Sequence, residues 1–265
     1  MKILAIGDIV GENAVKMLEN KLQSLKTKYN IDFVIANGEN AVKARGINKE
    51  LFYRIINLGV DVVTMGNHTY SNNGIYDISD ERLIVPINYD NNTFDKGFRI
   101  FECKGKKIFV SNVLGKRLGG NLNGFKQIEK ALSNINDDIK IRIVDYHGEY
   151  CNEKGAFAYY FKDKLSIVYG THTHVQTADD KILYNKLGFI TDIGMCGPIN
   201  STIGYDLDFE SKRYLEELDD DSKLSSDINC QFNGCIFEVD EETEKTIGIK
   251  RLNICGAEDE KIIED

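Results

Sequence analysis

The sequence predicts an α/β fold with a mixed β-sheet, and two observations lead to this class. In the N-terminal third, short apolar runs alternate with segments that repeat apolar residues every three or four positions. This alternation is typical of βαβ units and parallel strands. Further along, two apolar runs lie too close together for an intervening helix, so at least one antiparallel hairpin is expected as well.

The N-terminal elements follow the alternation. Lys2–Ile6 is predicted to be a buried first strand, and Ala14–Lys28 carries apolar residues at the spacing of a helix. Phe33–Ala36 and Val60–Thr64 are further apolar runs of strand length. Lys49–Leu58 lies between them and has the periodicity of a second helix, so the chain begins as strand, helix, strand, helix, strand.

The second part of the chain adds antiparallel elements. Phe98–Leu114 holds two apolar runs joined by Lys104-Gly105-Lys106, which is a hairpin signal. The remaining predicted elements are strands at Ile139–Tyr146, Leu165–Tyr169 and Gly188–Thr191, helices at Phe125–Leu132 and Glu153–Lys162, and an antiparallel pair formed by Gly234–Val239 and Thr246–Leu252. The sheet is therefore expected to be mixed.

Length and composition favour a single domain. The 265 residues, 42% of them hydrophobic, suffice for one large core, and no Pro-rich linker divides the chain, which has only two prolines. We expect one domain over residues 1–265. Acidic residues crowd the poorly periodic stretch Asp206–Asp227, which predicts a solvated surface excursion at about residues 201–229.

Charge and hydropathy exclude some partners. The formal charge is −9, from 42 acidic and 33 basic residues, so the surface is expected to repel long nucleic acids. The sequence has no apolar run of roughly 18 residues, the length of a membrane helix. The first apolar run leads directly into Gly7-Asp8 and leaves no room for a signal peptide. A cytoplasmic protein without a membrane partner is expected.

The six cysteines are scattered and include no Cys-x-x-Cys pair, which favours reduced thiols over a disulfide framework. Cys230 and Cys235 resemble half of a zinc site, but no partner pair lies nearby. We expect these cysteines to be structural.

Polar residues that can bind metals follow five of the predicted strands. They occur in Gly7-Asp8, Asn37-Gly38-Glu39-Asn40, Gly66-Asn67-His68, Tyr146-His147-Gly148 and Gly170-Thr171-His172-Thr173-His174. In open α/β sheets, ligands bind beyond the carboxyl ends of the strands, so these segments are expected to converge. In an extended segment, His172 and His174 would point to one face.

These residue types match the needs of a dinuclear metal site. Two neighbouring divalent ions need a bridging carboxylate, together with oxygen and imidazole donors that leave open positions. The candidate donors are Asp8, Glu39, Asn40, Asn67, His147, His172 and His174. Each has a simpler alternative: Asp8 could cap the next helix, the asparagines could serve turns, and His68 could merely hold its loop.

The same residues resemble the motifs of the calcineurin-like metallophosphoesterases. Gly66-Asn67-His68 matches the Gly-Asn-His motif, Gly170–His174 matches Gly-x-His-x-His, and Asp8 and His147 match isolated ligands. Val10 stands where the first motif has histidine, and Gly38-Glu39-Asn40 replaces the aspartate motif. Both departures resemble the bacterial YmdB-like phosphodiesterase branch, and the likeness extends from Met1 to about Leu252.

The resemblance implies a layered α/β/β/α sandwich and a role for each donor. Glu39 would bridge two divalent ions, with Asp8, Asn40 and His174 completing one ligand shell. Asn67, His147 and His172 would complete the other. His68 would lie outside both shells and protonate the leaving oxygen while a metal-bridging hydroxide attacks phosphorus. The ions implied are Fe or Mn, although Zn, Co or Ni also suit nitrogen and oxygen donors.

The resulting prediction is a phosphodiesterase for small phosphodiesters, most of all 2′,3′-cyclic nucleotides. Two alternatives stay open: a phosphomonoesterase or nucleotidase on the same scaffold, and a metal-binding regulatory protein with little turnover. The expected partner is a small phosphodiester or nucleotide substrate, and the resemblance makes a homo-oligomer plausible.

Overall fold

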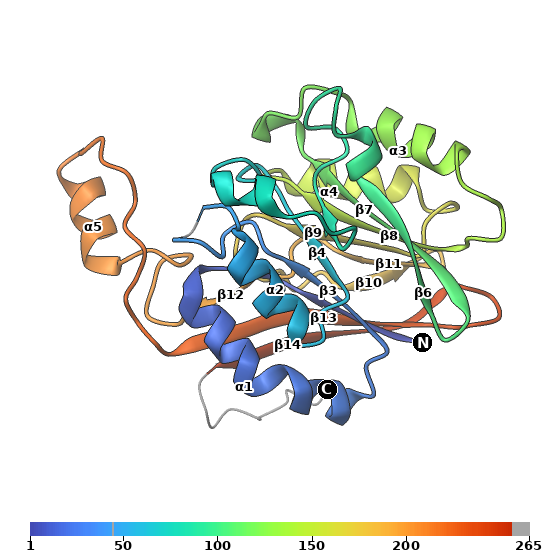
Figure 1. Cartoon of the computed structure of the whole chain (residues 1–265), viewed down its shortest axis with the longest axis horizontal. Helices are drawn as coiled ribbons and strands as arrows, with labels where there is room; N and C mark the ends of the chain where they lie inside the picture. The colour runs from blue at the N-terminus through green and yellow to red at the C-terminus, as the bar shows by residue number, and fades with distance from the viewer. Residues whose placement is uncertain (44, 256–265) are drawn as a thin grey trace.

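The computed structural model describes residues 1–43 and 45–255 and shows two mixed β-sheets packed face to face, with helices on both outer faces (Figure 1). The predicted α/β class and the layered α/β/β/α sandwich are confirmed. The predicted end of the domain, Asp265, lies outside the described residues.

The first sheet combines parallel and antiparallel strands. Its order is β2(Asp8–Ile9), β12(Met195–Pro198), β13(Cys230–Val239), β1(Lys2–Ile6), β3(Phe33–Asn37), β4(Val62–Thr64) and β5(Leu83–Ile84), with β14(Thr246–Cys255) paired to β13. Strands β1, β3, β4 and β5 are mutually parallel, whereas β13 runs antiparallel to β1, β12 and β14. The carboxyl ends of β1, β3 and β4 therefore lie at one edge.

The second sheet has the same character. Its order is β10(Lys181–Leu183), β11(Leu187–Ile190), β9(Ile167–Thr171), β8(Ile141–His147), β7(Lys106–Leu114) and β6(Phe98–Cys103). The central strands β7, β8 and β9 are parallel, and their register places Leu114 opposite His147 and His147 opposite Thr171. The ends of these strands are thus level with one another.

Helices cover the two outer faces. α1(Gly11–Tyr29) and α2(Lys49–Asn57) lie on the first sheet, and α3(Gly124–Ser133) and α4(Cys151–Tyr160) lie on the second (Figure 1). Short 3-10 helices occur at η1(Asn73–Asp77), η2(Phe94–Lys96) and η3(Lys116–Leu118). No helix among the described residues is long and apolar enough to span a bilayer.

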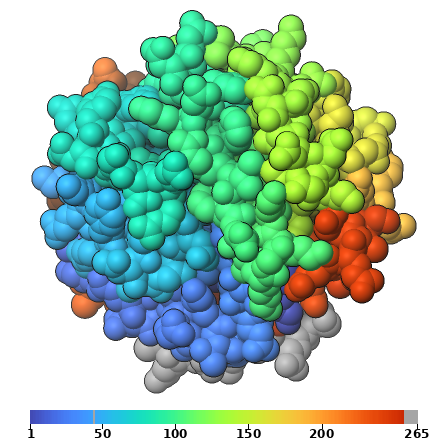
Figure 2. All heavy atoms as spheres, turned by 45° about the vertical axis from the view of Figure 1, so that its right-hand side comes forward, coloured from blue at the N-terminus to red at the C-terminus, as the bar shows by residue number. Residues whose placement is uncertain are grey.

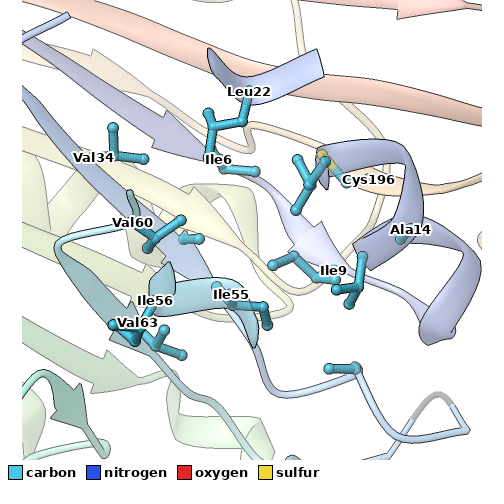
Figure 3. Packing of buried hydrophobic residues seen from close by; sticks show 14 of the residues in the cluster. Ile6, Ile9, Ala14, Leu22, Val34, Ile55, Ile56, Val60, Val63 and Cys196 are labelled. Atoms are coloured by element: carbon cyan, nitrogen blue, oxygen red, sulfur yellow. The ribbon is translucent and has the colours of Figure 1, made fainter. Parts of the chain in front are cut away.

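Three apolar clusters hold these layers together. Between the first sheet and its helices, Ile6 and Val34 face Leu22 of α1 while Ile55 and Ile56 of α2 pack nearby (Figure 3). A second cluster lies between the sheets, and a third joins the second sheet to α3 and α4. Because each central strand is covered on both faces, its sequence is a continuous apolar run rather than an alternating one.

The predicted hairpin is confirmed. β6 and β7 pair antiparallel, and the turn residues Lys104 and Gly105 have φ of 51° and 73°, the left-handed values of a tight two-residue hairpin turn. Lys104 Nζ lies 2.6 Å from Oδ1 of Asp32, the residue immediately before β3. Figure 2 shows the green segment containing this hairpin in the middle of one face, beside the blue N-terminal layer. The hairpin thus closes one side of the sandwich.

Several predicted boundaries are wrong by two or three residues. The strand predicted at Leu165–Tyr169 is Ile167–Thr171, because the backbone N–H of Leu165 still donates to Phe161 O at the end of the α4 segment. α1 begins at Gly11 instead of Ala14. The strands β2, β5, β10 and β12 were not predicted, because runs of two to four residues carry too little pattern to identify.

The acidic stretch contains a helix that the sequence analysis did not predict. α5(Leu207–Leu215) stands apart from the body of the molecule (Figure 1). Its N-cap, Asp206, accepts a hydrogen bond from Phe209 N at 2.9 Å, and Arg213 Nη2 lies 2.8 Å from Glu210 Oε2. Capping and local ion pairs stabilise this helix without a wide apolar face, so its periodicity is weak.

Two glycines allow a test of the packing beneath β9. A Cβ on Gly170 would lie 1.7 Å from Thr191 O, whereas a Cβ on Gly155 within α4 meets nothing within 4 Å. We expect Gly170→Ala to lower the free energy of unfolding by about 2 kcal/mol or more. Gly155→Ala should raise it by up to about 1 kcal/mol, because alanine favours the helix. Urea unfolding of both metal-free variants measures the difference, and equal midpoints would contradict this packing.

Candidate metal centre

The structure brings all of the predicted donors to one place, where the carboxyl ends of strands from both sheets meet. Asp8 lies in β2, Glu39 and Asn40 follow β3, Asn67 and His68 follow β4, His147 ends β8, and His172 and His174 follow β9. Asp8, Glu39, Asn40, His147 and His174 are buried, and the others are partly buried. The predicted convergence of five segments is therefore present in the fold.

The first group of donors surrounds one nitrogen of His147. His147 Nε2 lies 3.1 Å from Glu39 Oε1, 3.1 Å from Asn67 Oδ1 and 3.2 Å from His172 Nδ1. Each of these atoms offers a lone pair, and a single N–H could satisfy only one of them. Glu39, His147 and His172 also form a cluster whose ligand atoms lie within 4.8 Å of one another. Such crowding suits a cation that accepts several lone pairs at once.

A second group shares Glu39 with the first. The amide of Asn40 lies 3.2 Å from Glu39 Oε1 and 3.1 Å from His174 Nε2. Asp8 Oδ1 is 3.7 Å from His174 Nε2, and this buried oxygen has no hydrogen-bond partner among the described residues. Asn40 presents its nitrogen here, and a half-turn of the amide would present its oxygen instead. An orphaned carboxylate oxygen beside an imidazole fits a second cation.

The space between the donors depends on a glycine. A Cβ on Gly66 would lie 2.3 Å from Glu39 Oε2 and 2.4 Å from His147 Nε2. Any larger residue would therefore enter the volume that the first donor group encloses, so the Gly-Asn-His motif has a steric reason at its first position.

The orientation of His147 is set by a hydrogen-bond chain. Its Nδ1 lies 2.9 Å from Thr171 Oγ1, and the Thr171 hydroxyl donates to Asp145 Oδ1 at 2.6 Å. Thr64 Oγ1 donates to the other oxygen of Asp145, also at 2.6 Å. Because Thr171 uses its proton on Asp145, its oxygen accepts from Nδ1–H of His147, so Nε2 is the nitrogen that a metal would bind in place of a proton.

The other two imidazoles are oriented in the same way. His174 Nδ1 donates to Ile203 O at 2.7 Å, and His172 Nε2 lies 3.0 Å from Glu149 Oε2. The free lone pairs are then Nε2 of His174 and Nδ1 of His172, the atoms that face the two donor groups. Partners of this kind on the remote ring nitrogen are typical of metal-ligating histidines.

His172 and His174 do not share one face, as an extended segment would require. β9 ends at Thr171, and the two histidines have φ of 100° and 63°, in the left-handed region. His172 consequently turns toward His147, and His174 turns toward Asn40. The expectation based on strand geometry was wrong because tertiary contacts bend the backbone immediately after the strand.

A buried ion pair holds this strained loop. Lys154 Nζ donates to Asp192 Oδ2 and to Thr171 O, both at 2.9 Å, and Asp192 Oδ2 also accepts from Thr173 N at 3.1 Å. Both charged side chains are fully buried. Positive-φ residues other than glycine persist where the surroundings over-determine them, and this pair supplies such a constraint.

Burial and neighbouring charges shift the pKa values of the Glu39 and Asp8 carboxylates. Burial raises the pKa of Glu39, but His147 and His68 outweigh burial and lower the pKa to about 2. Burial also raises the pKa of Asp8, and it prevails there over His174 and His147, so the pKa is about 6. A bound cation would offset the cost of burying these two acids together.

Burial and neighbouring charges also shift the pKa values of His147 and His172, in opposite directions. Burial lowers the pKa of His147, yet Glu39 and Asp8 outweigh burial and raise it to about 9. Burial lowers the pKa of His172 to about 3, with His147 adding to the effect. The neutral form of His172, which is the form that binds metals, is therefore favoured.

His68 lies at the margin of the site. Its backbone N–H donates to Glu39 Oε2 at 2.8 Å, whereas its ring Nδ1 lies 3.4 Å from Ser71 Oγ. Burial lowers the pKa of His68, and Glu39 partly opposes this shift. The backbone thus fixes His68 to the donor group while its ring remains separate.

The residues that support the donors were not predicted from the sequence. Asp145 precedes His147 by two residues in a strand, so the two side chains share a face, and this spacing could have identified Asp145 as its partner. Lys154 and Asp192 carry no comparable signal, because only the tertiary fold brings them beneath β9.

Two mixed sheets with nitrogen and oxygen donors where they meet are the arrangement that the resemblance to the metallophosphoesterases implied. The chain belongs to the YmdB-like protein family, which it matches over residues 4–252.

Individual relatives span almost the whole chain. The chain is 34% identical over 257 residues to a 2′,3′-cyclic-nucleotide 2′-phosphodiesterase of Bacillus subtilis, and the match covers 96% of this chain and 97% of that protein. A phosphatase structure from Mycoplasma pneumoniae has a TM-score of 0.89 at 31% identity, covering 97% and 94% of the chains. A protein structure from Thermus thermophilus also has a TM-score of 0.89, at 28% identity, covering 97% and 100%.

The hydrogen-bond chain behind His147 can be tested by removing one hydroxyl. Thr171→Val should weaken metal binding about tenfold to a hundredfold, because Nδ1 of His147 loses its acceptor. Thr64→Val is the matched control, since it removes a buried hydroxyl from the same Asp145 carboxylate but leaves the acceptor of His147 Nδ1 in place. Chelator competition measures the dissociation constant of Mn²⁺ for each variant. Equal losses in both variants would show that the hydroxyl of Thr171 does not position His147.

Proposed function

We propose that this protein is a dinuclear metal-dependent phosphodiesterase for small phosphodiesters, with 2′,3′-cyclic nucleotides as its main substrates. The observation that carries the proposal is the presence of two donor groups that share the buried carboxylate of Glu39. The B. subtilis relative, named for 2′,3′-cyclic nucleotides, supports this substrate class. The predicted enzyme class, a phosphoric diester hydrolase, agrees with the name of the B. subtilis relative, whereas the M. pneumoniae structure is named a phosphatase.

The proposed ligand assignment follows the two groups. Glu39 would hold both ions, and the remaining ligands would divide into Asp8, Asn40 and His174 for one ion and Asn67, His147 and His172 for the other. Two divalent ions and the carboxylates of Asp8 and Glu39 leave a formal charge of about +2. When bound, such ions supply Lewis-acid activation of water and of the phosphoryl group. The centre therefore attracts a phosphate diester despite the acidic surface of the protein.

His68 is the proposed proton donor. Hydrolysis of a cyclic diester breaks one P–O bond of the ring, and the departing nucleoside oxygen must gain a proton. The backbone bond from His68 N to Glu39 Oε2 anchors the residue beside the centre, and its ring is not used by the donor groups. Burial lowers the pKa of His68, and the negative charge of a bound phosphate raises it again and favours the protonated form.

The ions proposed are Fe or Mn, with Zn, Co and Ni as competitors, because mixed nitrogen and oxygen donors accept all of them. The proposal further includes a cytoplasmic location and a homo-oligomer. Two other functions would use the same site: hydrolysis of phosphomonoesters, and regulation by a metal-bound form with little turnover. Metal content and the relative rates on diester and monoester substrates distinguish these functions.

Metal stoichiometry tests the dinuclear centre. We expect about two ions per chain after expression with added Mn or Fe. Glu39→Gln should lose more metal than Asp8→Asn, because Glu39 Oε1 lies within 3.2 Å of a side chain in each donor group and is the proposed bridge, whereas Asp8 Oδ1 lies 3.7 Å from His174 Nε2. Elemental analysis of purified protein provides the measurement. A ratio near one that His147→Ala does not change would refute the dinuclear assignment.

The role of His68 can be separated from metal binding by the choice of leaving group. His68→Ala should keep its metals but lose roughly two to four orders of magnitude in turnover of a 2′,3′-cyclic nucleotide, whose leaving alkoxide needs a proton. The loss on a nitrophenyl diester should be much smaller, because a phenolate leaves without a proton.

Steady-state rates for both substrates and both enzymes decide the matter. Equal losses on the two substrates would mean that His68 binds phosphate or holds its loop. Faster turnover of nucleoside monophosphates than of cyclic nucleotides by the unmodified enzyme would replace the diesterase with the nucleotidase. Full metal content without turnover of either substrate would favour the regulatory protein.

A further inference from the structure

Arg45 lies in a loop that folds back onto the donor groups. The backbone N–H of Gly46 donates to Glu39 O, Val42 N donates to Gly46 O at 3.0 Å, and Arg45 N donates to Val42 O at 2.8 Å. Because of these bonds, the segment that follows Asn40 turns back and contacts the backbone of Glu39. The cationic side chain of Arg45 therefore starts beside the residue that both donor groups share.

The acidic excursion at residues 201–229 contacts the centre and Arg45 together. Ile203 O accepts the hydrogen bond from His174 Nδ1, and Tyr205 follows two residues later. Burial raises the pKa of the Tyr205 phenol, and the nearby positive charge of Arg45 opposes this shift. Arg45 Nη2 also lies 3.4 Å from Asp221 Oδ1. Arg45 thus connects the loop after β3 to the segment that orients His174.

The backbone bonds of the loop to Glu39 place Arg45 at the edge of the donor groups, but its guanidinium is weakly held. Its ion pair with Asp221 is solvent-exposed, with side-chain exposures of 50% and 88%. Exposed pairs of this kind contribute little to stability, so another anion can replace the carboxylate.

We propose that Arg45 binds a non-bridging phosphoryl oxygen of the substrate and that Asp221 occupies its guanidinium until the substrate arrives. A planar guanidinium with several donors suits a phosphate oxygen geometrically, and its hydrogen bond to phosphate is charge-assisted. The phosphate displaces the Asp221 carboxylate, while the backbone bonds of the loop keep Arg45 beside Glu39. This inference rests on the proposed phosphodiesterase function and gives the acidic excursion a part in it.

Four variants of the metal-loaded, full-length protein test this role: Arg45→Met, Arg45→Lys, Asp221→Asn and Arg251→Met. Arg251 is the matched control. It is a half-exposed arginine on β14, and it forms an ion pair with Asp180 that does not involve Arg45 or Asp221. The measurements are kcat and KM for bis(4-nitrophenyl) phosphate, the inhibition constant of inorganic phosphate, and metal content.

Arg45→Met should raise KM and the phosphate inhibition constant about tenfold to a hundredfold, as expected for one lost hydrogen bond between charged groups. Its metal content should not change, and its kcat should change far less than its KM. Arg45→Lys should recover part of the loss, because a charge remains without the planar fork. Asp221→Asn should lower KM by removing the competing carboxylate, and Arg251→Met should match the unmodified enzyme.

An unchanged KM and phosphate inhibition constant in Arg45→Met would overturn the binding role. A rise of KM in Asp221→Asn to the level of Arg45→Met would overturn the displacement, because Asp221 would then orient Arg45 for the substrate. If the unmodified enzyme hydrolyses no diester, the proposed function itself fails. Calorimetric titration of inorganic phosphate into the metal-loaded protein then tests Arg45 separately: weaker binding by Arg45→Met supports the anion site, and equal binding refutes it.

Discussion

The carboxylate of Glu39 is the point on which the site depends. Its Oε1 lies 3.1 Å from His147 of the second sheet and 3.2 Å from Asn40 of the first, and its Oε2 accepts the N–H of His68. A buried carboxylate is costly unless paired and hydrogen-bonded. The two sheets must therefore meet with their strand ends level, since a small shift of one sheet would leave this charge without partners.

The polar layer beneath the donors maintains that alignment. Asp145 accepts hydroxyl protons from Thr64 of the first sheet and Thr171 of the second, so one carboxylate connects β4, β8 and β9. Lys154 and Asp192 add a fully buried ion pair under the loop that carries His172. Apolar residues of the same volume would often give equal or greater stability than such a pair. We interpret these groups as constraints on donor orientation, consistent with the left-handed backbone that they support.

The difference between what could and could not be predicted from the sequence has physical causes. Lys2–Ile6 and the strands that follow it carry long apolar runs, and strand polarity then determines which polar residues converge, so Glu39 and His147 could be placed together without coordinates. The orientation of His172 and His174 depends on φ angles that Lys154 and Asp192 impose from another layer. No local pattern records such contacts. Asp145 was not predicted, but it could have been, because strand periodicity places its side chain on the same face as that of His147.

Electrostatics separates the centre from the surface around it. The chain carries a formal charge of −9, which opposes the approach of a long polyanion, whereas the proposed centre with two ions is locally positive. Arg45 lies between the two, because its loop bonds to the backbone of Glu39 while its exposed partner is Asp221 of the acidic excursion. In the proposed mechanism, a small phosphodiester would meet only this boundary and would exchange with the single carboxylate of Asp221. An extended nucleic acid would have to pass many acidic groups at once, so the charge pattern itself favours small substrates.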